Sequence, residues 1–401
     1  MATRGSALHT ASSLRALEAA WEHVRPSPSH PAWRQSHPDH RQLLRIATNT
    51  EEELKKLGRK LKDGYEFSPL RIFPLEKGPD KFRIICIPSI RDRIVQRTIL
   101  DFLTHKDRCG LINPVAFGFA RGELDKSHVA AAKKALELRS EREVALKTDI
   151  SQFFDSIDRD RLAEIIRTRV PPTTLHDVLI KASRSEHSTG NAYRARLAKD
   201  NNIVRGFGVR QGMPLSPFFA ALFLRDFDQW LTGAGIPAIR YADDLIFFAA
   251  TERDARQLFS EVQSRLNALG LECPNLSEGT KSQIALPKEP IDFLGARILW
   301  NDGRYTLQLP AETIERIGNR FQSLGTPEGA LRENVNLFSL GTRLREWEHS
   351  YLAAYEHCEN CGSLGQKMQA EAVKAKRRLL ESLGIKLDSL GSAEKAILKL
   401  S

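Results

Sequence analysis

Residues 238–248 read AIRYADDLIFF, and this stretch indicates the fold more strongly than any other part of the chain. Apolar runs lie on both sides of Asp243 and Asp244, and β-branched and aromatic residues around a polar pair predict two short strands joined by a tight turn. Aspartate is common in turns, so the pair also has a purely structural interpretation. A chemical role would require further carboxylates near the same turn.

A third carboxylate, Asp149, follows a similar apolar run. Residues 144–148 read VALKT, which is typical of a short buried strand, and Asp149 comes directly after it. Asp149 could cap a following helix. However, an unpaired carboxylate beside buried strands is unfavourable, and divalent cations neutralise such groups through oxygen ligands. The three aspartates together predict phosphoryl transfer with two metal ions about 3.5–4 Å apart.

Other motifs give these aspartates a family context. Residues 149–157 read DISQFFDSI and residues 210–217 read RQGMPLSP. With YADD at 241–244, they resemble the first catalytic motif, the QGxxxSP motif and the YxDD box of reverse transcriptases. Further matching blocks, in the family's order and approximate spacing, are Lys77 and Arg83 before Ile87-Pro88, residues 91–96, residues 116–122, Gly270-Leu271 with Lys281, and Phe293-Leu294-Gly295.

This resemblance covers residues 64–300 and is to bacterial reverse transcriptases of the retron, group II intron and defence-associated lineages. It implies an α+β chain with the right-hand polymerase fold: fingers, an antiparallel-sheet palm and a helical thumb. The implied boundaries are a helical extension at 1–63, fingers and the start of the palm at 64–148, the palm at 149–300, and the thumb and C-terminal region at 301–401.

The resemblance implies that Asp149, Asp243 and Asp244 are catalytic residues and metal ligands, with the carbonyl of Ile150 as a further ligand. The implied cofactor is a pair of Mg²⁺ ions, with Mn²⁺ as an alternative. The implied activity is RNA-directed DNA synthesis.

The resemblance also assigns residues that would contact the incoming dNTP. Lys77 and Arg83 would contact the triphosphate, Gln211 would line the nucleotide pocket, and Lys281 would neutralise or protonate the pyrophosphate. Phe154 would be a steric gate that collides with a ribose 2′-hydroxyl, so deoxynucleotides would be preferred. The plain alternatives are a solvated hairpin face for Lys77 and Arg83, a surface lysine for Lys281 and a core aromatic for Phe154.

A third set of residues would contact template and primer. Gly212 would permit close backbone approach to the nucleic acid, and Gly295 would permit a tight turn beside the primer. The full set implied by the resemblance is Arg210, Gly212, Tyr241, Phe293, Leu294 and Gly295.

The composition agrees with an anionic partner. The chain has 401 residues, with 60 Lys and Arg against 50 Asp and Glu, a formal net charge of +10. The family resemblance implies a structured noncoding RNA template, a DNA primer or product, dNTPs, and either self-association or an associated defence protein. Several such enzymes belong to anti-phage systems.

Membrane and secretory roles find no support in the sequence. No window approaches the roughly 20 apolar residues of a membrane span, and residues 1–30 lack a signal-peptide pattern, so a cytoplasmic location is expected. The five cysteines are scattered, which argues against a disulfide framework. Cys358 and Cys361 form a single CxxC without a second pair, which is weak support for zinc.

The periodicity also predicts the surrounding elements. Residues 40–61 show the pattern of one amphipathic helix, residues 67–88 that of a hairpin, and residues 217–230 that of an apolar helix. Residues 184–206 are polar and basic without a clear period, which predicts a loop or insertion. Helices are expected from residue 311 to the C-terminus.

Two other functions remain open. One is a related polymerase activity, either RNA-directed RNA synthesis, which Phe154 disfavours, or template-independent terminal transfer. The other is an RNA-binding scaffold with a vestigial polymerase site, against which the intact Asp149, Asp243, Asp244, Gln211 and Lys281 weigh.

Overall fold

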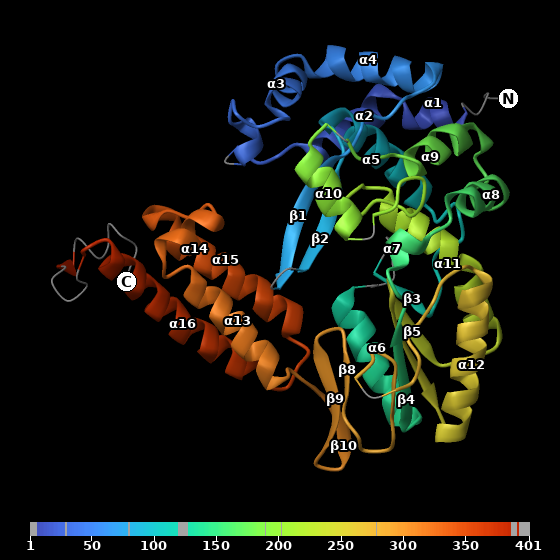
Figure 1. The fold of residues 1–401 in the computed structure, drawn as a ribbon, viewed down its shortest axis with the longest axis vertical. Coiled ribbons are helices and arrows are strands. Elements are labelled where there is room, and N and C mark those ends of the chain that lie inside the picture. Colours follow the sequence, from blue (N-terminus) through green and yellow to red (C-terminus); the bar gives the residue numbers. More distant parts are fainter. Residues whose placement is uncertain are drawn as a thin grey trace.

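The computed structural model describes residues 6–28, 30–78, 81–118, 127–188, 190–201, 203–277, 279–385 and 391–392. The chain folds into a mixture of α-helices and β-sheets (Figure 1). The predicted strands around Asp149 and the Asp243–Asp244 turn are confirmed, and they lie next to each other in one sheet. That sheet is the framework of the candidate site.

The central sheet has five strands in the order β3-β5-β6-β4-β7. Neighbouring strands are antiparallel except for β3 and β5, which are parallel. The strands are β3 (Ala116–Phe117), β4 (Val144–Asp149), β5 (Ala238–Tyr241), β6 (Asp244–Ala249) and β7 (Gln283–Ala285).

Alternate residues of the central strands belong to two different hydrophobic cores. In β6, Leu245 and Phe247 belong to one core and Ile246 and Phe248 to the other. Side chains alternate across a strand, so this pattern means that the sheet is covered on both faces. Because both faces of the sheet are buried, β6 is apolar along nearly its whole length, with the run LIFFA.

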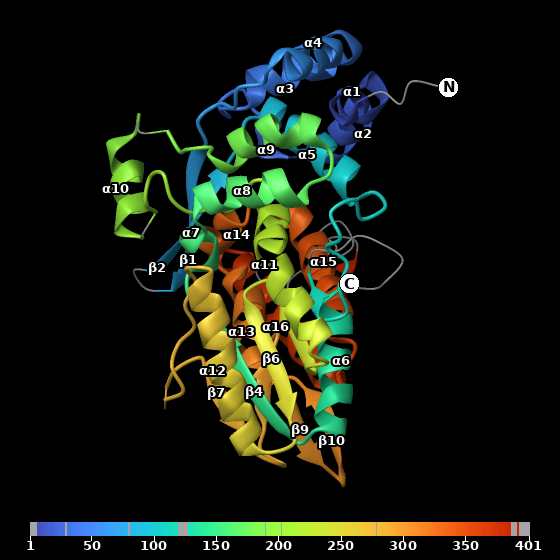
Figure 2. The ribbon, with the colours of Figure 1, turned by 90° about the vertical axis from the view of Figure 1, so that its right-hand side faces the viewer.

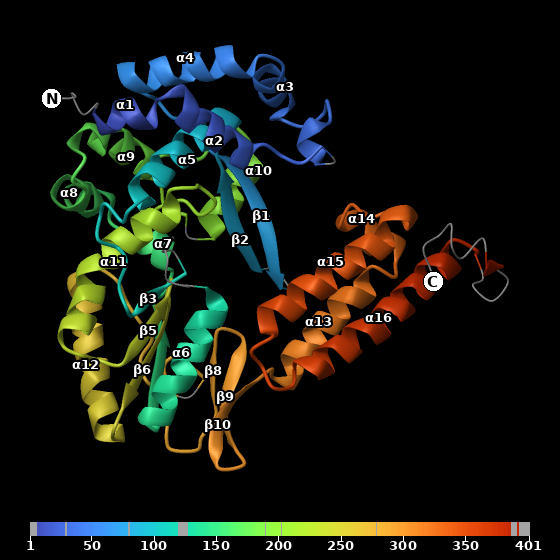
Figure 3. The ribbon, with the colours of Figure 1, turned by 180° about the vertical axis from the view of Figure 1, so that it is seen from behind.

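Helices cover the two faces. On the first face lie α11 (Ser216–Gly233) and α12 (Glu252–Ala268), which Figure 2 shows in front of β4 and β6. Helices α8 (Arg159–Arg169) and α9 (His176–Ser183) belong to the same core and lie above the sheet in that view. On the second face, α6 (His128–Glu141) lies between the central sheet and a second sheet (Figure 3). The short helix α7 (Phe153–Ser156) and the 3-10 turn η2 (Thr173–Leu175) complete this region.

The N-terminal helices share the first core with the hairpin of β1 (Arg71–Gly78) and β2 (Lys81–Ile87). The predicted hairpin is therefore present, although its turn at residues 79–80 lies outside the described residues. The helices are α1 (Ala7–Ala11), α2 (Leu14–Val24), η1 (Pro31–Trp33), α3 (His40–Thr48), α4 (Thr50–Asp63) and α5 (Ile90–Thr104), and they lie at the top of Figure 1.

Two local predictions were wrong. The single helix expected at 40–61 is broken at Asn49, whose φ of −130° is not helical, and three glutamates then favour a new N-terminus in α4. The expected loop at 184–206 contains α10 (Ala192–Asp200), which begins where the side chain of Asn191 accepts a hydrogen bond from the backbone N–H of Arg194, at 2.9 Å.

The C-terminal part follows the second core. A three-stranded sheet of β8 (Ile291–Phe293), β9 (Ala296–Asn301) and β10 (Arg304–Gln308) leads into four helices, as expected. They are α13 (Ala311–Ser323), α14 (Pro327–Arg332), α15 (Leu337–Tyr355) and α16 (Cys361–Ser382), seen beside the two sheets in Figure 3. Among the described helices, none is long and apolar enough to cross a membrane. All five cysteines are free, as expected.

A buried ion pair joins α11 to the central sheet. Asp228 of α11 accepts two hydrogen bonds from the guanidinium of Arg240 in β5, at 2.6 and 2.5 Å, and both side chains are about 95% buried. Arg240 also donates to the carbonyl of Ala242 in the aspartate turn, at 3.2 Å. This ion pair therefore supports the turn as well as the helix.

A second network of buried charges holds residues 184–210 in place. Glu186 accepts hydrogen bonds from Arg159 at 2.6 Å and from Arg210 at 2.9 Å. Asp155 lies near the Arg210 guanidinium, and its buried Oδ1 has no hydrogen-bond partner. Burial raises the pKa of Asp155 to about 6, although Arg210 acts in the opposite direction.

Removing Asp228 should leave the Arg240 guanidinium buried without its carboxylate partner. We expect Asp228→Ala to lower the free energy of unfolding by about 3–5 kcal/mol, measured by chemical denaturation. The matched control on the same helix is Asp226→Ala, because Asp226 forms exposed pairs with Arg169 and Arg225. Its expected effect is below about 1 kcal/mol. Equal effects of the two substitutions would contradict a structural role for the buried pair.

Asp155 should make stability depend on pH. The pKa of Asp155 is higher in the folded chain than its ordinary value of 3.8, so protonation of Asp155 stabilises the fold. This stabilisation is fully present below pH 3.8 and is lost as the pH rises through about 6. Asp155→Asn keeps a neutral group there, so its free energy of unfolding should exceed that of the wild type above pH 6 by on the order of 2 kcal/mol.

Denaturation curves recorded from about pH 4 to pH 8 would measure this difference. Asp160→Asn, at a carboxylate 90% exposed, is the control and should change stability by less than about 0.5 kcal/mol at each pH. Parallel pH profiles for Asp155→Asn and the wild type would refute the assignment.

Candidate active site

Three aspartates come together where β4 ends and β6 begins. Asp149, the last residue of β4, pairs directly with Asp244, the first residue of β6. Asp243 lies in the turn before β6, and its carbonyl accepts a hydrogen bond from the backbone N–H of Ile150, at 3.0 Å. The two loops that carry the carboxylates are therefore tied together by backbone contacts.

Both loops contain a non-glycine residue in the left-handed region. Ala242 has φ +54° in the turn between β5 and β6, and Gln152 has φ +46° just after Asp149. This conformation is unfavourable for residues with a Cβ and persists only where the surroundings enforce it. At Ala242 the enforcing contact is the Arg240 guanidinium on its carbonyl.

The electrostatics of this cluster favour a cation. Asp149 is 5% exposed, its Oδ1 is buried without a hydrogen-bond partner, and its other oxygen pairs with the Lys281 ammonium. Burial raises the pKa of Asp244, with a further increase from the charge of Asp243. The hydrogen bond to Asp149 raises the pKa of Lys281.

Carboxylate oxygens of this kind suit hard divalent ions, so the donor set fits the expected cofactor. In this structure, Lys281 is the cation that Asp149 contacts. Across the described ranges, no three His, Cys, Asp or Glu side chains have the arrangement of a ready-made metal site, and this includes the CxxC of Cys358 and Cys361.

A cavity of about 570 Å³ contains several of the residues predicted to bind the nucleotide. Phe154 of α7, Gln211 and Gly212 line it together with Ile85 of β2 and residues of α2 and α5. Phe154 is half-buried, and its ring lies 5.6 Å from that of Phe153, which is the core aromatic of the pair. The structure thus brings Phe154 and Gln211 to one pocket.

The hairpin presents Arg83 to the same side as this cavity. Arg83 is exposed and lies two residues from Ile85 in β2, so both side chains project from the same face of the hairpin. Lys77 lies in β1, but its side chain is outside the described part of the chain. In the matching block at 116–122, residues 119–122 are likewise outside it.

The requirement for glycine at position 212 comes from a contact with β2, and the predicted approach to nucleic acid stays a prediction. Gly212 has φ +104°, and a Cβ there would lie 2.6 Å from the side chain of Ile85 and 2.8 Å from the carbonyl of Cys86. The backbone N–H of Cys86 also donates to the carbonyl of Gln211, at 2.7 Å. The close approach that excludes a side chain is therefore to β2.

Arg210 does not fit its predicted contact with template or primer. Its side chain has no exposed surface, and its guanidinium donates to Glu186 and to the carbonyl of Val204, at 2.9 and 2.7 Å. The position of Arg210 gives it a role in internal packing, supporting the following Gln211.

The predicted primer-contact segment is part buried and part exposed. Phe293 is 1% exposed and belongs to the second core, whereas Gly295 is exposed. Because Phe293 pairs with Ala296, Leu294 and Gly295 form a two-residue turn, with φ of +51° and +77°. The expected tight turn is confirmed, and the burial of Phe293 leaves Leu294 and Gly295 nearer the surface.

An aromatic cluster next to Tyr241 was not found from the sequence. The ring of His128 in α6 lies 5.8 Å from Tyr241, 6.4 Å from Tyr355 and 6.2 Å from His357. The cluster therefore links α6 and the end of α15 to the strand before the aspartate turn. His128, Tyr241 and the pair Tyr355 and His357 are more than 100 positions apart from one another, so spacing gave no signal of their contact.

Comparisons with known proteins relate this chain to a family. The family model described as "Reverse transcriptase (RNA-dependent DNA polymerase)" matches residues 75–298. Protein YkfC of Escherichia coli K12 is 24% identical over 311 residues, which cover 65% of this chain and 75% of YkfC. The "Uncharacterized 91 kDa protein in cob intron" of Schizosaccharomyces pombe is 26% identical over 167 residues, 42% of this chain and 19% of that protein.

The family match covers more than half of the chain and spans Asp149, Asp243 and Asp244 as well as the cavity at Phe154 and Gln211. The chain therefore belongs to the reverse transcriptase family, the RNA-directed DNA polymerases.

Proposed function

We propose that Asp149, Asp243 and Asp244 form the catalytic centre at which this chain adds deoxynucleotides to a primer. The observation that carries this proposal is the direct pairing of Asp149 with Asp244 in the β4–β6 ladder, with one Asp149 oxygen buried and unpartnered. Two carboxylates placed directly opposite each other repel each other unless a cation lies between them. A reaction that requires bound cations explains this arrangement best.

Asp149, Asp243 and Asp244 would hold two Mg²⁺ ions, or Mn²⁺ in their place, with the Ile150 carbonyl as an additional ligand. Bound there, the ions would stabilise charge on the attacking and leaving oxygens of an in-line displacement. The hydrogen bond between Ile150 and Asp243 keeps the two loops in one register, which pre-orients the carboxylates.

The other residues would bind and orient the nucleotide. Phe154 would exclude a 2′-hydroxyl from the cavity that it shares with Gln211. Arg83 and Lys77, on the hairpin, would neutralise the triphosphate. The Lys281 ammonium contacts Asp149 and is 74% exposed, so it can also reach a departing pyrophosphate.

The architecture supports an assignment to the parts of a polymerase hand. We assign 1–63 to a helical extension, 64–148 to fingers and the start of the palm, 149–300 to the palm, and 301–401 to the thumb and C-terminal region. The sheet with the aspartates falls in the palm, the β1–β2 hairpin in the fingers and α13–α16 in the thumb. Tyr241, Leu294 and Gly295 would then contact the primer or template.

We further propose that the template is a dedicated structured noncoding RNA and that the enzyme serves anti-phage defence, alone as an oligomer or with a defence protein. The net charge of +10 supports polyanion binding, and the resemblance to bacterial lineages supports the rest. Sequencing the RNA that copurifies from the native host tests this extension, and a random RNA population would contradict it.

Replacing the turn carboxylates should abolish synthesis. We expect Asp243→Ala/Asp244→Ala to lower dNTP incorporation by at least about 10³-fold, because charge stabilisation worth several kcal/mol is lost. The measurement is labelled dNTP incorporation on a primed RNA template with Mg²⁺, with RNA binding measured in parallel. RNA affinity should change little.

Asp254→Ala is the matched control, because Asp254 is an exposed carboxylate on α12. Full activity of the double variant would rule out the proposed centre. Aspartate-dependent synthesis that persists after RNase treatment would instead indicate terminal transfer.

Phe154→Ala should relax the choice of sugar. Opening the cavity beside the ribose should raise the ratio of ribonucleotide to deoxynucleotide kcat/KM by roughly 10–100-fold. Phe154→Tyr, which keeps the ring, should leave the ratio unchanged. Single-nucleotide addition with dNTP and rNTP measures both constants, and an equal loss with the two substrates would argue for a packing role.

A further inference from the structure

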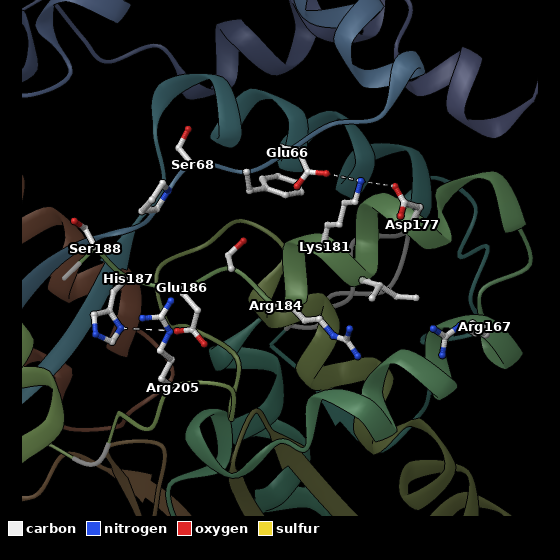
Figure 4. Close-up of a pocket in the computed structure, with 14 residues that line it drawn as sticks. Glu66, Ser68, Arg167, Asp177, Lys181, Arg184, Glu186, His187, Ser188 and Arg205 are labelled. Atoms are coloured by element: carbon white, nitrogen blue, oxygen red, sulfur yellow. Dashed lines mark ion pairs between the residues drawn. The ribbon is translucent and has the colours of Figure 1, made fainter. Parts of the chain in front are cut away.

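A second cavity, of about 720 Å³, lies between the segment before β1, helices α8 and α9, and residues 184–188 (Figure 4). Its lining includes Ser185 and His187 together with Arg167, Arg184 and Arg205, and it is called the Ser185 pocket below. It shares no lining residue with the cavity around Phe154 and Gln211. None of its residues belongs to the proposed catalytic centre.

Acidic residues in the lining already have basic partners. Glu66 and Asp177 both pair with Lys181, at 2.7 and 3.0 Å (Figure 4). Glu186 accepts from Arg159 and Arg210, which lie behind the pocket. These carboxylates therefore do not repel an anion as free charges would.

Two guanidinium groups of the lining remain available. Arg184 pairs with Asp160, whereas Arg167 and Arg205 have no ion pair within the described part of the chain. Both Arg167 and Arg205 are exposed, and Figure 4 shows Arg205 beside His187 and Glu186. The uncompensated charge of the pocket is thus positive.

The floor of the pocket holds two buried polar groups without partners. Ser185 is 6% exposed, and its Oγ has no hydrogen-bond partner. The side chain of His187 is 8% exposed, and its Nδ1 lies 3.9 Å from Glu186, beyond hydrogen-bond distance. Burial lowers the pKa of His187, and Arg210 lowers it further, so the ring is neutral and can donate one N–H.

The backbone holds these groups in fixed positions. The N–H of Leu70 donates to the carbonyl of Glu186, and the N–H of Ser188 donates to the carbonyl of Leu70, both at 2.8 Å. Residues 186–188 thus lie against the start of β1 as a short parallel bridge. A buried polar group without a partner is unfavourable by about 1–3 kcal/mol, and two on a rigid segment indicate that a ligand completes them.

We propose that the Ser185 pocket binds a phosphate group of an RNA strand outside the catalytic cavity. Neutral hydroxyl and imidazole donors combined with free guanidinium groups suit phosphate oxygens, which accept several hydrogen bonds and carry negative charge. The volume accommodates a nucleotide unit. This inference rests on the proposed function, because it assumes that the chain handles RNA.

The test reverses the two free charges. For Arg167→Glu/Arg205→Glu we expect the Kd for a fluorescein-labelled single-stranded RNA to rise by about tenfold or more, measured by anisotropy. Loss of the one phosphate that the pocket neutralises should also reduce the slope of log Kd against log salt by about 0.7. Single dNTP addition at saturating primer–template should be unchanged.

The matched control is Arg142→Glu/Arg253→Glu, which changes the charge by the same amount. These exposed arginines flank the other end of the β4–β6 pair, where Val144 pairs with Ala249. The RNA affinity of the control should fall only slightly. If both double variants lose affinity and salt dependence equally, the effect is one of net charge and the proposal fails.

Ser185→Ala is a second variant that does not risk the fold, because it removes an oxygen without a partner. It should weaken RNA binding by roughly threefold to tenfold, as expected for the net contribution of one hydrogen bond. Unchanged affinity in Ser185→Ala and in the arginine pair would overturn the proposal.

The source of the phosphate is tested with AMP. Displacement of AMP by RNA in the wild type, and loss of both in the variants, would support the RNA site. AMP binding that depends on Arg167 and Arg205 while RNA affinity does not would assign the pocket to a free nucleotide instead. A wild type that neither binds RNA nor extends a primer would contradict the proposed function itself, which separates the two failures.

Discussion

The structure depends on the placement of Asp149 directly opposite Asp244 on two paired strands. Like charges at this position are destabilising, and burial increases the penalty. The pairing persists because the alternate residues of β4 and β6 are buried in two separate cores. A shift of the register by one residue would move every one of these side chains to the wrong face, so hydrophobic burial holds the carboxylates together.

Two basic side chains stabilise the region around the paired aspartates. Lys281 contacts Asp149 directly, and Arg240 supports the strained turn at Ala242 while pairing with Asp228. The two cations differ in burial, since Lys281 is 74% exposed and Arg240 is 4% exposed. The exposed ammonium of Lys281 is accessible to solvent, whereas the buried guanidinium of Arg240 is a fixed part of the framework.

Local patterns were enough to predict the strands, the hairpin and the three aspartates, because their apolar periodicity and turn residues lie within short segments. The break at Asn49 and the start of α10 are set by short capping signals that periodicity does not report. The burial of Arg210 and Phe293 depends on contacts with residues far along the chain. The same is true of Gly212, whose need for glycine comes from β2. The family resemblance identified the motif that contains Gly212, but it did not identify β2 as the neighbour that excludes a side chain there.

Glu186 connects the two cavities structurally. Its carboxylate pairs with Arg210, which directly precedes Gln211 in the lining of the first cavity, while Ser185 and His187 on either side of Glu186 line the second cavity. Buried ion pairs of this kind contribute little net stability but strongly restrict geometry, because an unpaired partner would be very unfavourable. The position of Gln211 is therefore tied to the backbone at 184–188.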